Sequence, residues 1–396
     1  MGSFKDTPAP RLGAHAIKAA LARSTLPAET ISHVYMGNVL SAGVGQAPAR
    51  QAAIFAGLAE TTEATTVNKV CASGLKAVTL AVQDIQLGHA TAVIAGGMEN
   101  MSLVPRYLAR TPPAYGHAAA DDGLIRDGLW DVYNQFAMGN CAENTARKLG
   151  ITRADQDKFA LESYRRAKAA WEQTDPAPVF QAEIVPVEIP QRKGPPLVVA
   201  RDEEYNAVNV SKVPTLKTAF IKESEGGTIT AANSSTLSDG ASALVLAAKS
   251  LVDKHSLLLN NSTSSSSSSS SQPHSRVLAR IIAHADAATH PIDFPLAPTL
   301  AIPLALQRAG LHLRDISRFE INEAFAAVSL AVERVLGLDP AKVNVHGGAI
   351  ALGHALGSSG SRILVSLLHT LDSGDFGIAA ICNGGGGATA LVIQKM

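Results

Sequence analysis

Cysteines, aromatic residues and long apolar runs are all scarce in this 396-residue sequence, and neither sign of charge predominates. Three cysteines are too few, and odd in number, for a disulfide framework, which favours a reducing compartment. The 34 lysines and arginines balance 34 acidic residues, so no net charge attracts nucleic acid or an anionic membrane. No apolar run approaches the ~20 residues of a membrane span, and the N-terminal MGSFKDTPAP has no signal-peptide core. We therefore expect neither a nucleic-acid nor a membrane partner.

What the sequence does contain is small apolar residues. Hydrophobic residues make up 46% of the chain and 32 residues are glycine, a balance typical of tightly packed α/β proteins. The length allows two domains of ordinary size, or two halves that share one core.

Two segments follow the same plan. Residues 66–97 and 343–387 each read as an extended segment, a glycine-containing turn, an apolar helix, a short loop, a buried strand and a glycine pair. The helix of the second segment is expected to begin after Gly360. Alternating strands and helices indicate parallel sheets covered on both faces. The sequence thus predicts an α/β fold of two similar halves, with the functional site where they meet.

The region between these segments is rich in proline and contains short helical patterns such as Thr152–Trp171. We interpret it as a long excursion that covers a site. The serine run Ser264–Ser271 has nothing to bury and is expected to be a disordered insertion. The predicted boundaries are 1–101 for the first part of the N-terminal half, 102–228 for the excursion, 229–248 for the last part of that half, and 249–396 for the C-terminal half, with the insertion at 262–272.

Cys71 lies in VNKVCASGLKAVTL, where an apolar run meets a turn of small residues and a helical pattern begins. A thiol at a helix N-terminus is exposed to unpaired N–H groups and a positive dipole end, which favour the thiolate. We therefore expect Cys71 to be a nucleophile, although a buried and inert cysteine is the plain alternative.

Four more motifs supply polar chemistry: TAANSSTLSDGAS at 230–242, NEAFA at 322–326, GGAIALGHALGSSG at 347–360 and CNGGGG at 382–387. Together they offer a second thiol, an imidazole, a carboxamide and exposed backbone N–H groups, which suit acyl transfer and carbon–carbon chemistry at a thioester. Each has an ordinary alternative. Asn322 could cap a helix that begins at Glu323, the glycine run could be only a turn or a phosphate cradle, and Cys141 is expected to be structural.

VCASG, NEAF, GGAIALGH and CNGGGG, in this order, resemble the thiolase family, and within it the acetoacetyl-CoA thiolases. The resemblance implies a five-layered α/β fold with a loop domain inserted in the first half. It implies reversible condensation of two acetyl-CoA to acetoacetyl-CoA and CoA. By motif match Cys71 is acylated, His354 activates it, Cys382 exchanges a proton with the substrate α-carbon, and Asn322 holds a water of one oxyanion hole. The backbone N–H groups of Cys71 and Gly384 form the other.

The same resemblance places Tyr164, Lys212 and Ser235 on coenzyme A contacts and implies no cofactor for the chemistry beyond the thioester substrate. In potassium-dependent members a monovalent cation lies beside the ligand. The matching positions are Tyr164, Ala231, Ala232, Ser234 and Ile350, where mostly main-chain carbonyls would bind K⁺. The family commonly forms a homotetramer, which is also expected here.

The chain departs from the family pattern at three points. Ala355 replaces the usual proline after His354. Ala137 stands where mitochondrial-type members often carry histidine, which favours a cytoplasmic protein with a role in the mevalonate pathway and sterol biosynthesis. The family's first strand, which precedes the motif that ends near Phe4, is expected to be absent.

Two rival functions remain open. A ketoacyl synthase acting on carrier-protein thioesters has the same fold, but such sites usually pair one cysteine with two histidines. A non-catalytic, thiolase-like lipid-binding or scaffold protein is the other rival, and retention of both cysteines, His354 and Asn322 argues against it.

Overall fold

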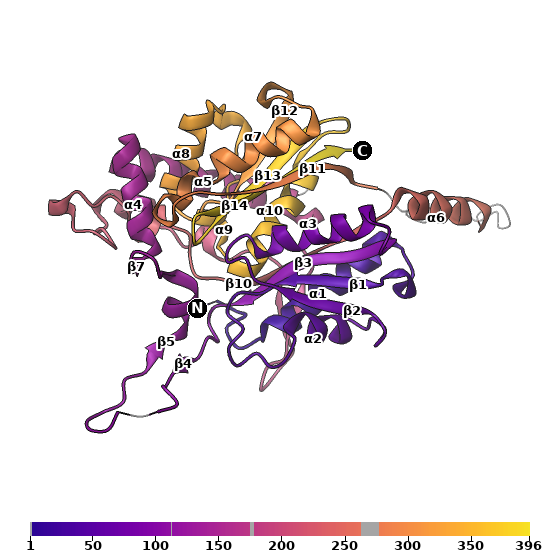
Figure 1. Cartoon of the computed structure of the whole chain (residues 1–396), viewed down its shortest axis with the longest axis horizontal. Helices are drawn as coiled ribbons and strands as arrows, with labels where there is room; N and C mark the ends of the chain where they lie inside the picture. The colour runs from indigo at the N-terminus through magenta and orange to yellow at the C-terminus, as the bar shows by residue number, and fades with distance from the viewer. Residues whose placement is uncertain (1, 112, 175–177, 263–276) are drawn as a thin grey trace.

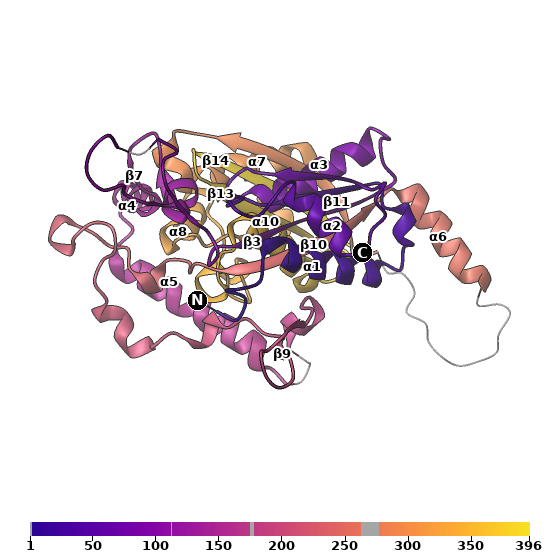
Figure 2. The ribbon, with the colours of Figure 1, turned by 90° about the horizontal axis from the view of Figure 1, so that it is seen from below.

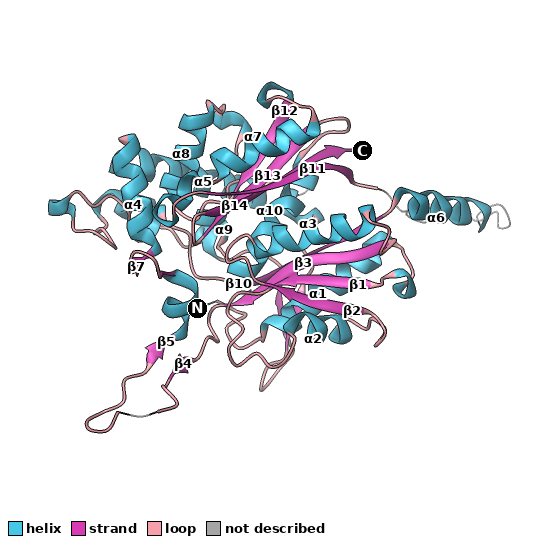
Figure 3. Ribbon diagram, viewed as in Figure 1, coloured by secondary structure: helices cyan, strands magenta, loops and turns pink. Residues whose placement is uncertain are grey.

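The computed structural model describes residues 2–111, 113–174, 178–262 and 277–396, with the side chains of 256–262 excepted. Two four-stranded sheets form its centre (Figures 1 and 3). The serine run predicted to be disordered lies outside the described residues. No helix in the described ranges is both long and apolar enough to cross a membrane.

The N-terminal half contains the sheet β10-β3-β1-β2. β1 pairs in parallel with both β2 and β3, and β10 runs antiparallel to β3 along nine residue pairs. β3 is buried along its whole length, as its apolar run predicts, and it extends three residues beyond the predicted end at Gly97. The elements are α1 (Ala9–Ser24), β1 (His33–Gly37), α2 (Pro48–Phe55), β2 (Glu63–Val67), α3 (Ser73–Gln86), β3 (Ala92–Asn100) and β10 (Asp239–Ala247).

The C-terminal half repeats this plan in the sheet β11-β14-β13-β12. β12 and β13 are parallel, whereas β14 runs antiparallel to both β13 and β11. The second apolar helix begins at Leu356 rather than after Gly360, so the GSSG segment is helical. The elements are α6 (Lys249–Ser262), β11 (Ala279–Ala288), α7 (Pro298–Ala309), β12 (Ile316–Ile321), α8 (Ala326–Leu336), α9 (Ala349–Leu352), α10 (Leu356–Thr370), β13 (Phe376–Asn383) and β14 (Gly387–Lys395).

The two sheets and their helices stack in five layers (Figure 1). α1 and α2 cover the outer face of the N-terminal sheet, and α7 covers the outer face of the C-terminal sheet. α3 and α10 lie between the sheets, since α3 contacts β3 and β14 while α10 contacts β3 and β13. This confirms the predicted α/β architecture of two similar halves.

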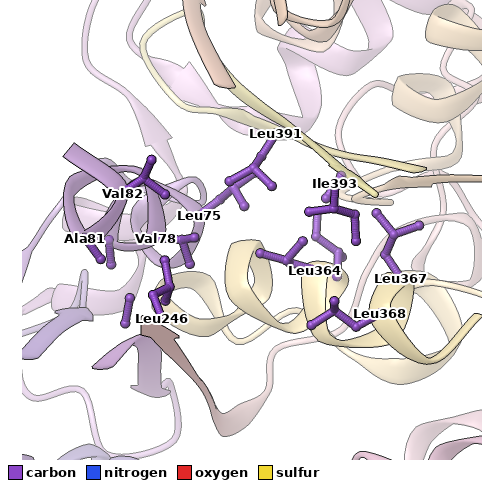
Figure 4. Packing of buried hydrophobic residues seen from close by; sticks show 14 of the residues in the cluster. Leu75, Val78, Ala81, Val82, Leu246, Leu364, Leu367, Leu368, Leu391 and Ile393 are labelled. Carbon is purple, nitrogen blue, oxygen red and sulfur yellow. The ribbon is translucent and has the colours of Figure 1, made fainter. Parts of the chain in front are cut away.

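The middle layer forms the main apolar core. Leu75 and Val78 of α3 face Leu364 and Leu367 of α10, and Leu391 of β14 closes the cluster from the second sheet (Figure 4). All five side chains are buried. Because the helices that carry the Cys71 and His354 motifs share this core, burial of apolar area holds the two motifs in fixed relation.

The excursion leaves the N-terminal half after β3 and returns at β10 (Figure 2). Its longest helix is α5, predicted from Thr152 to Trp171, and the Thr152 side chain caps its N-terminus in a reciprocal pair with Asp155. α5 contacts α8 and α9 of the C-terminal half, so the excursion covers the end of that half. Its helical elements include α4 (Met138–Leu149), α5 (Arg153–Glu172) and the 3₁₀ helices η5 (Val210–Thr215) and η7 (Ala231–Asn233). Short strands complete it: β4 (Arg106–Tyr107), β5 (Asp121–Asp122), β6 (Trp130–Asp131), β7 (Phe136–Ala137), β8 (Val187–Ile189) and β9 (Leu197–Val199).

The halves differ at one edge. β14 lies between β13 and β11, whereas β10, its counterpart, pairs only with β3 in the described part of the chain. β14 is buried from Gly387 to Ile393, but in β10 only Ser242 and Leu246 are buried. β10 is therefore an edge strand where its counterpart is a central one.

Candidate active site

Cys71 lies on a strained turn directly before α3. Val70 has a φ of 48°, in the left-handed region that β-branched residues strongly disfavour. Ser73 closes the turn, because its hydroxyl donates to the Val70 carbonyl (2.5 Å) and accepts the Lys69 N–H (2.8 Å). Strain of this kind persists only where the surroundings enforce it, and it is typical of functional positions.

The other half of the molecule holds this turn in place. The Lys69 ammonium donates to the Asp286 carboxylate of β11 and to the Thr389 hydroxyl of β14 (2.8 Å). Lys76, on the first turns of α3, donates to the other oxygen of Asp286 (2.8 Å). The position of the Cys71 turn thus depends on contacts that cross between the two halves.

Cys71 lies directly before α3, and its expected role as the nucleophile stays a prediction. Burial raises the pKa of the Cys71 thiol to about 12, although the Gly384 backbone N–H next to it lowers that pKa. α3 begins at Ser73, so the thiol precedes the helix, and its desolvation outweighs the dipole. A resting thiol of this kind needs a base to accept its proton before it can attack a thioester.

His354 offers that base. It is 5% exposed, and its backbone N–H donates to the Thr236 carbonyl and to the Ser238 hydroxyl, both at 3.1 Å. Its Nδ1 lies 2.6 Å from the Ser359 hydroxyl, and its Nε2 is buried without a hydrogen-bond partner in the described residues. Burial lowers the pKa of His354 to about 4, so the ring is neutral near pH 7 and can accept a proton.

Cys382 is fully buried near the end of β13. Burial raises the pKa of the Cys382 thiol well above the ordinary value. A negative charge on Cys71 would raise that pKa further, because the two sulfurs are close enough to interact electrostatically. Cys141 belongs to the same apolar cluster and has a partner that the sequence did not reveal, because its thiol lies 3.4 Å from an Asp131 oxygen. The assignment of Cys141 as structural stays a prediction.

Asn322 lies just beyond β12, with its backbone N–H bonded to the Ala380 carbonyl (3.0 Å). It does not cap a helix, because α8 begins at Ala326 after the N-cap Phe325. Its side-chain oxygen and nitrogen are both buried without a hydrogen-bond partner in the described residues. A buried amide without hydrogen bonds costs free energy unless a ligand or a water molecule supplies them. The Asn322 side chain is therefore suited to bind a ligand or a water.

Gly384 follows β13 and lies close to the Cys71 turn. A β-carbon at this position would lie 3.5 Å from a Val70 methyl group and 3.7 Å from the Met138 side chain. The structure thus brings Cys71, Gly384 and Cys382 together. His354 and Asn322 lie on the loops before α10 and α8, and Asn322 lines a small chamber together with Gly353 and Ser359, which flank His354 in the sequence.

The predicted coenzyme A residues lie on separate elements. Tyr164 is buried in α5, and burial raises its pKa. The Ser235 hydroxyl donates to the Ala324 carbonyl (3.0 Å) beside the NEAF loop. Lys212 lies on η5 with its side chain exposed, and no contact joins it to Tyr164 or Ser235.

The residues matched to a K⁺ site lie on elements that pack together. Tyr164 is on α5, Ala231 and Ala232 are on η7, and Ile350 is on α9; α5 contacts both η7 and α9. The Ser234 hydroxyl donates to the Thr230 carbonyl (2.7 Å), which ties its side chain to η7. No group of three or more His, Cys, Asp or Glu suited to a metal occurs in the described ranges.

Two buried carboxylates near the site escaped the sequence analysis. Glu99 accepts bonds from the backbone N–H groups of Val39 (3.0 Å), Leu40 (3.2 Å) and Gly357 (2.9 Å). Glu323 accepts from Ser163 (2.7 Å), from Asn344 (2.9 Å) and from the Ile350 N–H (3.2 Å). The available signal was a glutamate within or just beyond a buried apolar strand, Glu99 in β3 and Glu323 two residues after β12.

A surface groove of about 770 Å³ follows α5 and is lined by Arg153, Lys158, Arg165 and neighbouring residues. None of the predicted site residues lines it. A much smaller chamber of about 20 Å³ is lined by Asn322, Ser359, Glu320 and Arg362, among others. The chamber therefore adjoins Asn322, whereas the groove adjoins none of the candidate catalytic residues.

Residues 1–250 match the model of the N-terminal thiolase domain, and residues 275–395 match that of the C-terminal thiolase domain. A mitochondrial acetyl-CoA acetyltransferase of Gibberella zeae is 57% identical, and one of Aspergillus fumigatus is 55% identical; each match covers 100% of this chain and 87% of the relative. The mitochondrial enzyme of Mus musculus is 50% identical over 100% of this chain and 88% of its own. The crystal structure of the Acat5 thiolase from Ascaris suum in complex with coenzyme A superposes with a TM-score of 0.91, at 42% identity, covering 100% of this chain and 96% of that one.

The expected cytoplasmic location is wrong, because these fungal and vertebrate relatives are named mitochondrial. Their names also give no support to the role in the mevalonate pathway. The cytoplasmic location was inferred from Ala137, but the identity of one residue beside Met138 depends on local packing and does not determine where the protein is located in the cell.

Proposed function

Because the chain belongs to the thiolase family, we propose that it is an acetyl-CoA acetyltransferase, which condenses two acetyl-CoA reversibly to acetoacetyl-CoA and CoA. The observation that carries this proposal is the pair of thiols beside the Gly384 N–H, with a neutral imidazole available as base. Relatives of this name that are 50–57% identical over the whole chain support it.

In the first half-reaction the Cys71 proton passes to His354 Nε2 as the sulfur attacks the thioester carbonyl. The C–S bond to coenzyme A breaks, and the CoA thiolate takes the proton from His354. The Gly384 and Cys71 N–H groups would bind the developing oxyanion, a contribution of about 10²–10³ in rate for one such donor. The raised pKa of the Cys71 thiol makes the base necessary.

In the second half-reaction Cys382 first gives its own proton to the free His354 imidazole, and the resulting thiolate then removes an α-proton from a second acetyl-CoA. The enolate carbon attacks the acetyl group on Cys71, a C–C bond forms, and the bond to the Cys71 sulfur breaks. The released Cys71 thiolate takes the proton back from His354. Asn322 would stabilise the enolate oxygen through a water, since its amide has no partner within the described residues. Two bases are required because the thiol proton and the carbon-bound proton lie on different atoms.

We further infer that Tyr164, Lys212 and Ser235 contact coenzyme A, and that carbonyls of Ala231, Ala232, Ser234 and Ile350 with Tyr164 bind K⁺. The packing of both η7 and α9 against α5 supports the cation site. Activity measured in KCl and in an equal concentration of tetramethylammonium chloride tests it, because a K⁺ site makes the rate rise only with KCl.

A homotetramer is also proposed. The hairpin formed by β4 and β5 projects from the molecule (Figure 1), and Tyr115 at its tip is 98% exposed. Trp130, Val132 and Tyr133, after the hairpin, are exposed as well. Exposed apolar side chains in this number mark an association surface. Light scattering on the purified chain measures the assembly, and fractionation of cells that express the full-length protein tests a mitochondrial location.

The decisive experiment is thiolysis of acetoacetyl-CoA by CoA, followed by loss of acetoacetyl-CoA and appearance of acetyl-CoA. Turnover that disappears in the Cys71→Ala variant supports the proposal. Activity only with acetyl thioesters of a carrier protein would instead support a ketoacyl synthase. Ligand binding without turnover on either substrate would support the non-catalytic alternative.

A further inference from the structure

Ser359 is joined to His354 by a short hydrogen bond that the reaction scheme above does not use. The Ser359 hydroxyl lies 2.6 Å from His354 Nδ1, and it also donates to the Ala355 carbonyl at 3.0 Å. Both Ser359 and His354 are 5% exposed, so solvent does not compete for these bonds.

A hydroxyl has only one proton to donate. When Ser359 gives it to the Ala355 carbonyl, its oxygen can only accept at its other contact, and the proton in that contact must belong to His354 Nδ1. Only with the ring proton on Nδ1 can the Ser359 hydroxyl make both hydrogen bonds, one to the Ala355 carbonyl and one to His354. If the ring proton were on Nε2, Ser359 would have to choose between Nδ1 and the carbonyl, and one bond would be lost.

We propose that Ser359 is a positioning residue that holds His354 in the tautomer with its proton on Nδ1, so that the Nε2 lone pair is free to accept the Cys71 proton. This inference rests on the proposed acetyltransferase function and adds a residue to it. Nε2 is buried and without a partner in the described residues, as a base awaiting a proton requires. The opposite tautomer would place a proton on Nε2 and could not accept another.

The position of Ser359 in the fold makes the bond rigid. Ser359 lies in the first turns of α10, and its backbone N–H donates to the same Ala355 carbonyl (2.9 Å). A serine that bonds the carbonyl four residues earlier is a common helical arrangement. The packing of α10 between the two sheets therefore fixes the hydroxyl that orients the ring.

Charged groups do not set the tautomer in place of Ser359. Burial alone accounts for the lowered pKa of His354, and no charged side chain contributes to it. Glu99 is directed at the Gly357 N–H in the same segment. Glu320 lies across the 20 Å³ chamber that Ser359 and Asn322 also line, and burial raises its pKa well above the usual value, which favours the uncharged acid.

The test compares Ser359→Ala with Ser359→Thr, which keeps a hydroxyl, and with the matched control Ser358→Ala. Ser358 is the adjacent buried serine, and its hydroxyl bonds Ser242 (2.9 Å) and not His354. We expect Ser359→Ala to lower kcat for thiolysis by about 10²-fold, the low end of the range for impaired acid–base catalysis, with KM for CoA unchanged. Ser359→Thr should restore most of the rate, and Ser358→Ala should stay near wild type.

A second readout does not depend on turnover. The rate at which iodoacetamide modifies Cys71, followed by peptide mapping between pH 6 and 9, reports assistance by His354. In Ser359→Ala we expect slower modification near pH 7 and a pH profile shifted toward that of an unassisted thiol. Equal modification rates in Ser359→Ala and wild type, or an equal loss in Ser358→Ala, would overturn the role of Ser359. Absence of thiolysis by the wild type, with the modification difference intact, would instead refute the proposed function and leave the tautomer assignment standing.

Discussion

Gly97 of β3 and Gly357 of α10 touch backbone to backbone: a β-carbon on Gly97 would collide with the carbonyl oxygen of Gly357. Gly357 lies three residues after His354, and its N–H donates to Glu99 on the same strand, β3 (2.9 Å). The distance of the His354 segment from the N-terminal sheet is therefore set by the absence of a side chain at Gly97.

The variant Gly97→Ala should move this segment. Because the added methyl meets backbone and not a flexible side chain, we expect a loss of about 1–3 kcal/mol in unfolding free energy, as for other overpacked cores, with a fall in kcat. Urea unfolding and thiolysis measure the two effects. Gly240→Ala on the adjacent strand is the control, since its β-carbon would meet only Ala355 at an ordinary 3.8 Å. Equal stability of both variants would show that the contact is not tight.

The roles of the two reactive cysteines can be separated. Cys71→Ala should abolish labelling of the protein by radiolabelled acetyl-CoA. Cys382→Ala should still become labelled but condense the acetyl group at least ~10²-fold more slowly, because a positioned base contributes about that much.

The third thiol provides the matched control for this experiment. Cys141→Ala should label and condense like wild type, since its thiol is directed at Asp131. The assignment is wrong if Cys382→Ala prevents labelling or if Cys71→Ala still accepts the label.

Ala355→Pro should stabilise the protein. Ala355 has a φ of −71°, within the range that proline imposes, and its N–H makes no hydrogen bond in the described residues. His354 pairs with Leu237 in a β-bridge, and an extended residue before proline is favourable. We expect a gain of about 0.4–1 kcal/mol from the restricted unfolded chain, with thiolysis preserved because the Ala355 carbonyl is kept. A lower melting temperature would mean that the ring does not fit beside Gly240.

Acid should destabilise the fold partly through buried histidines. Burial, with smaller contributions from the charges of Lys395 and Arg23, lowers the pKa of His369 to about 4. As pH falls below the ordinary value near 6.5, the unfolded chain takes up this proton before the folded one does, so stability is lost between about pH 6.5 and 4. Burial raises the pKa of Glu99 and Glu183 to about 7, which acts in the opposite direction over the same range.

A difference measurement isolates the histidine. We expect His369→Gln to gain about 1–3 kcal/mol relative to wild type as the pH is lowered from 7 to 4.5, measured by urea unfolding at each pH. A constant difference between the two proteins across this range would show that His369 titrates normally in the folded state.

Sequence patterns were sufficient to predict features that depend on a single helix or strand. The buried strand β3 and the capped helix α5 follow from local composition, and the repeated plan predicted two similar halves. Effects that depend on several distant segments could not be predicted. The pKa of Cys71 is raised by packing from both halves, and the helix at Leu356 forms through a Gly-Ser-rich segment because tertiary burial overrides its low helix propensity. The bond from Ser359 to His354 requires that helix, so it was hidden as well.

The unpaired edge of β10 should accept an added strand. In the C-terminal half, β11 pairs with β14 and residues 289–297 lead from it to α7. In the N-terminal half, residues 2–8 lead in the same way to α1, which packs on β10, and the N-terminus lies near this strand in Figure 1. A strand placed ahead of Gly2 therefore has both a matching edge and a connection of suitable length.

The test is a fusion that places a ten-residue segment rich in valine and isoleucine ahead of Gly2, matching the length of β11. Each of its side chains that becomes buried would contribute about 1.5–3 kcal/mol as an upper estimate, so we expect a clear rise in melting temperature and in soluble yield. The control carries proline at the two central positions, which removes ladder donors while it keeps an apolar segment of the same length. Since only ordered pairing along β10 distinguishes the two fusions, equal melting temperatures would show that the edge does not bind a strand, whatever the effect on solubility.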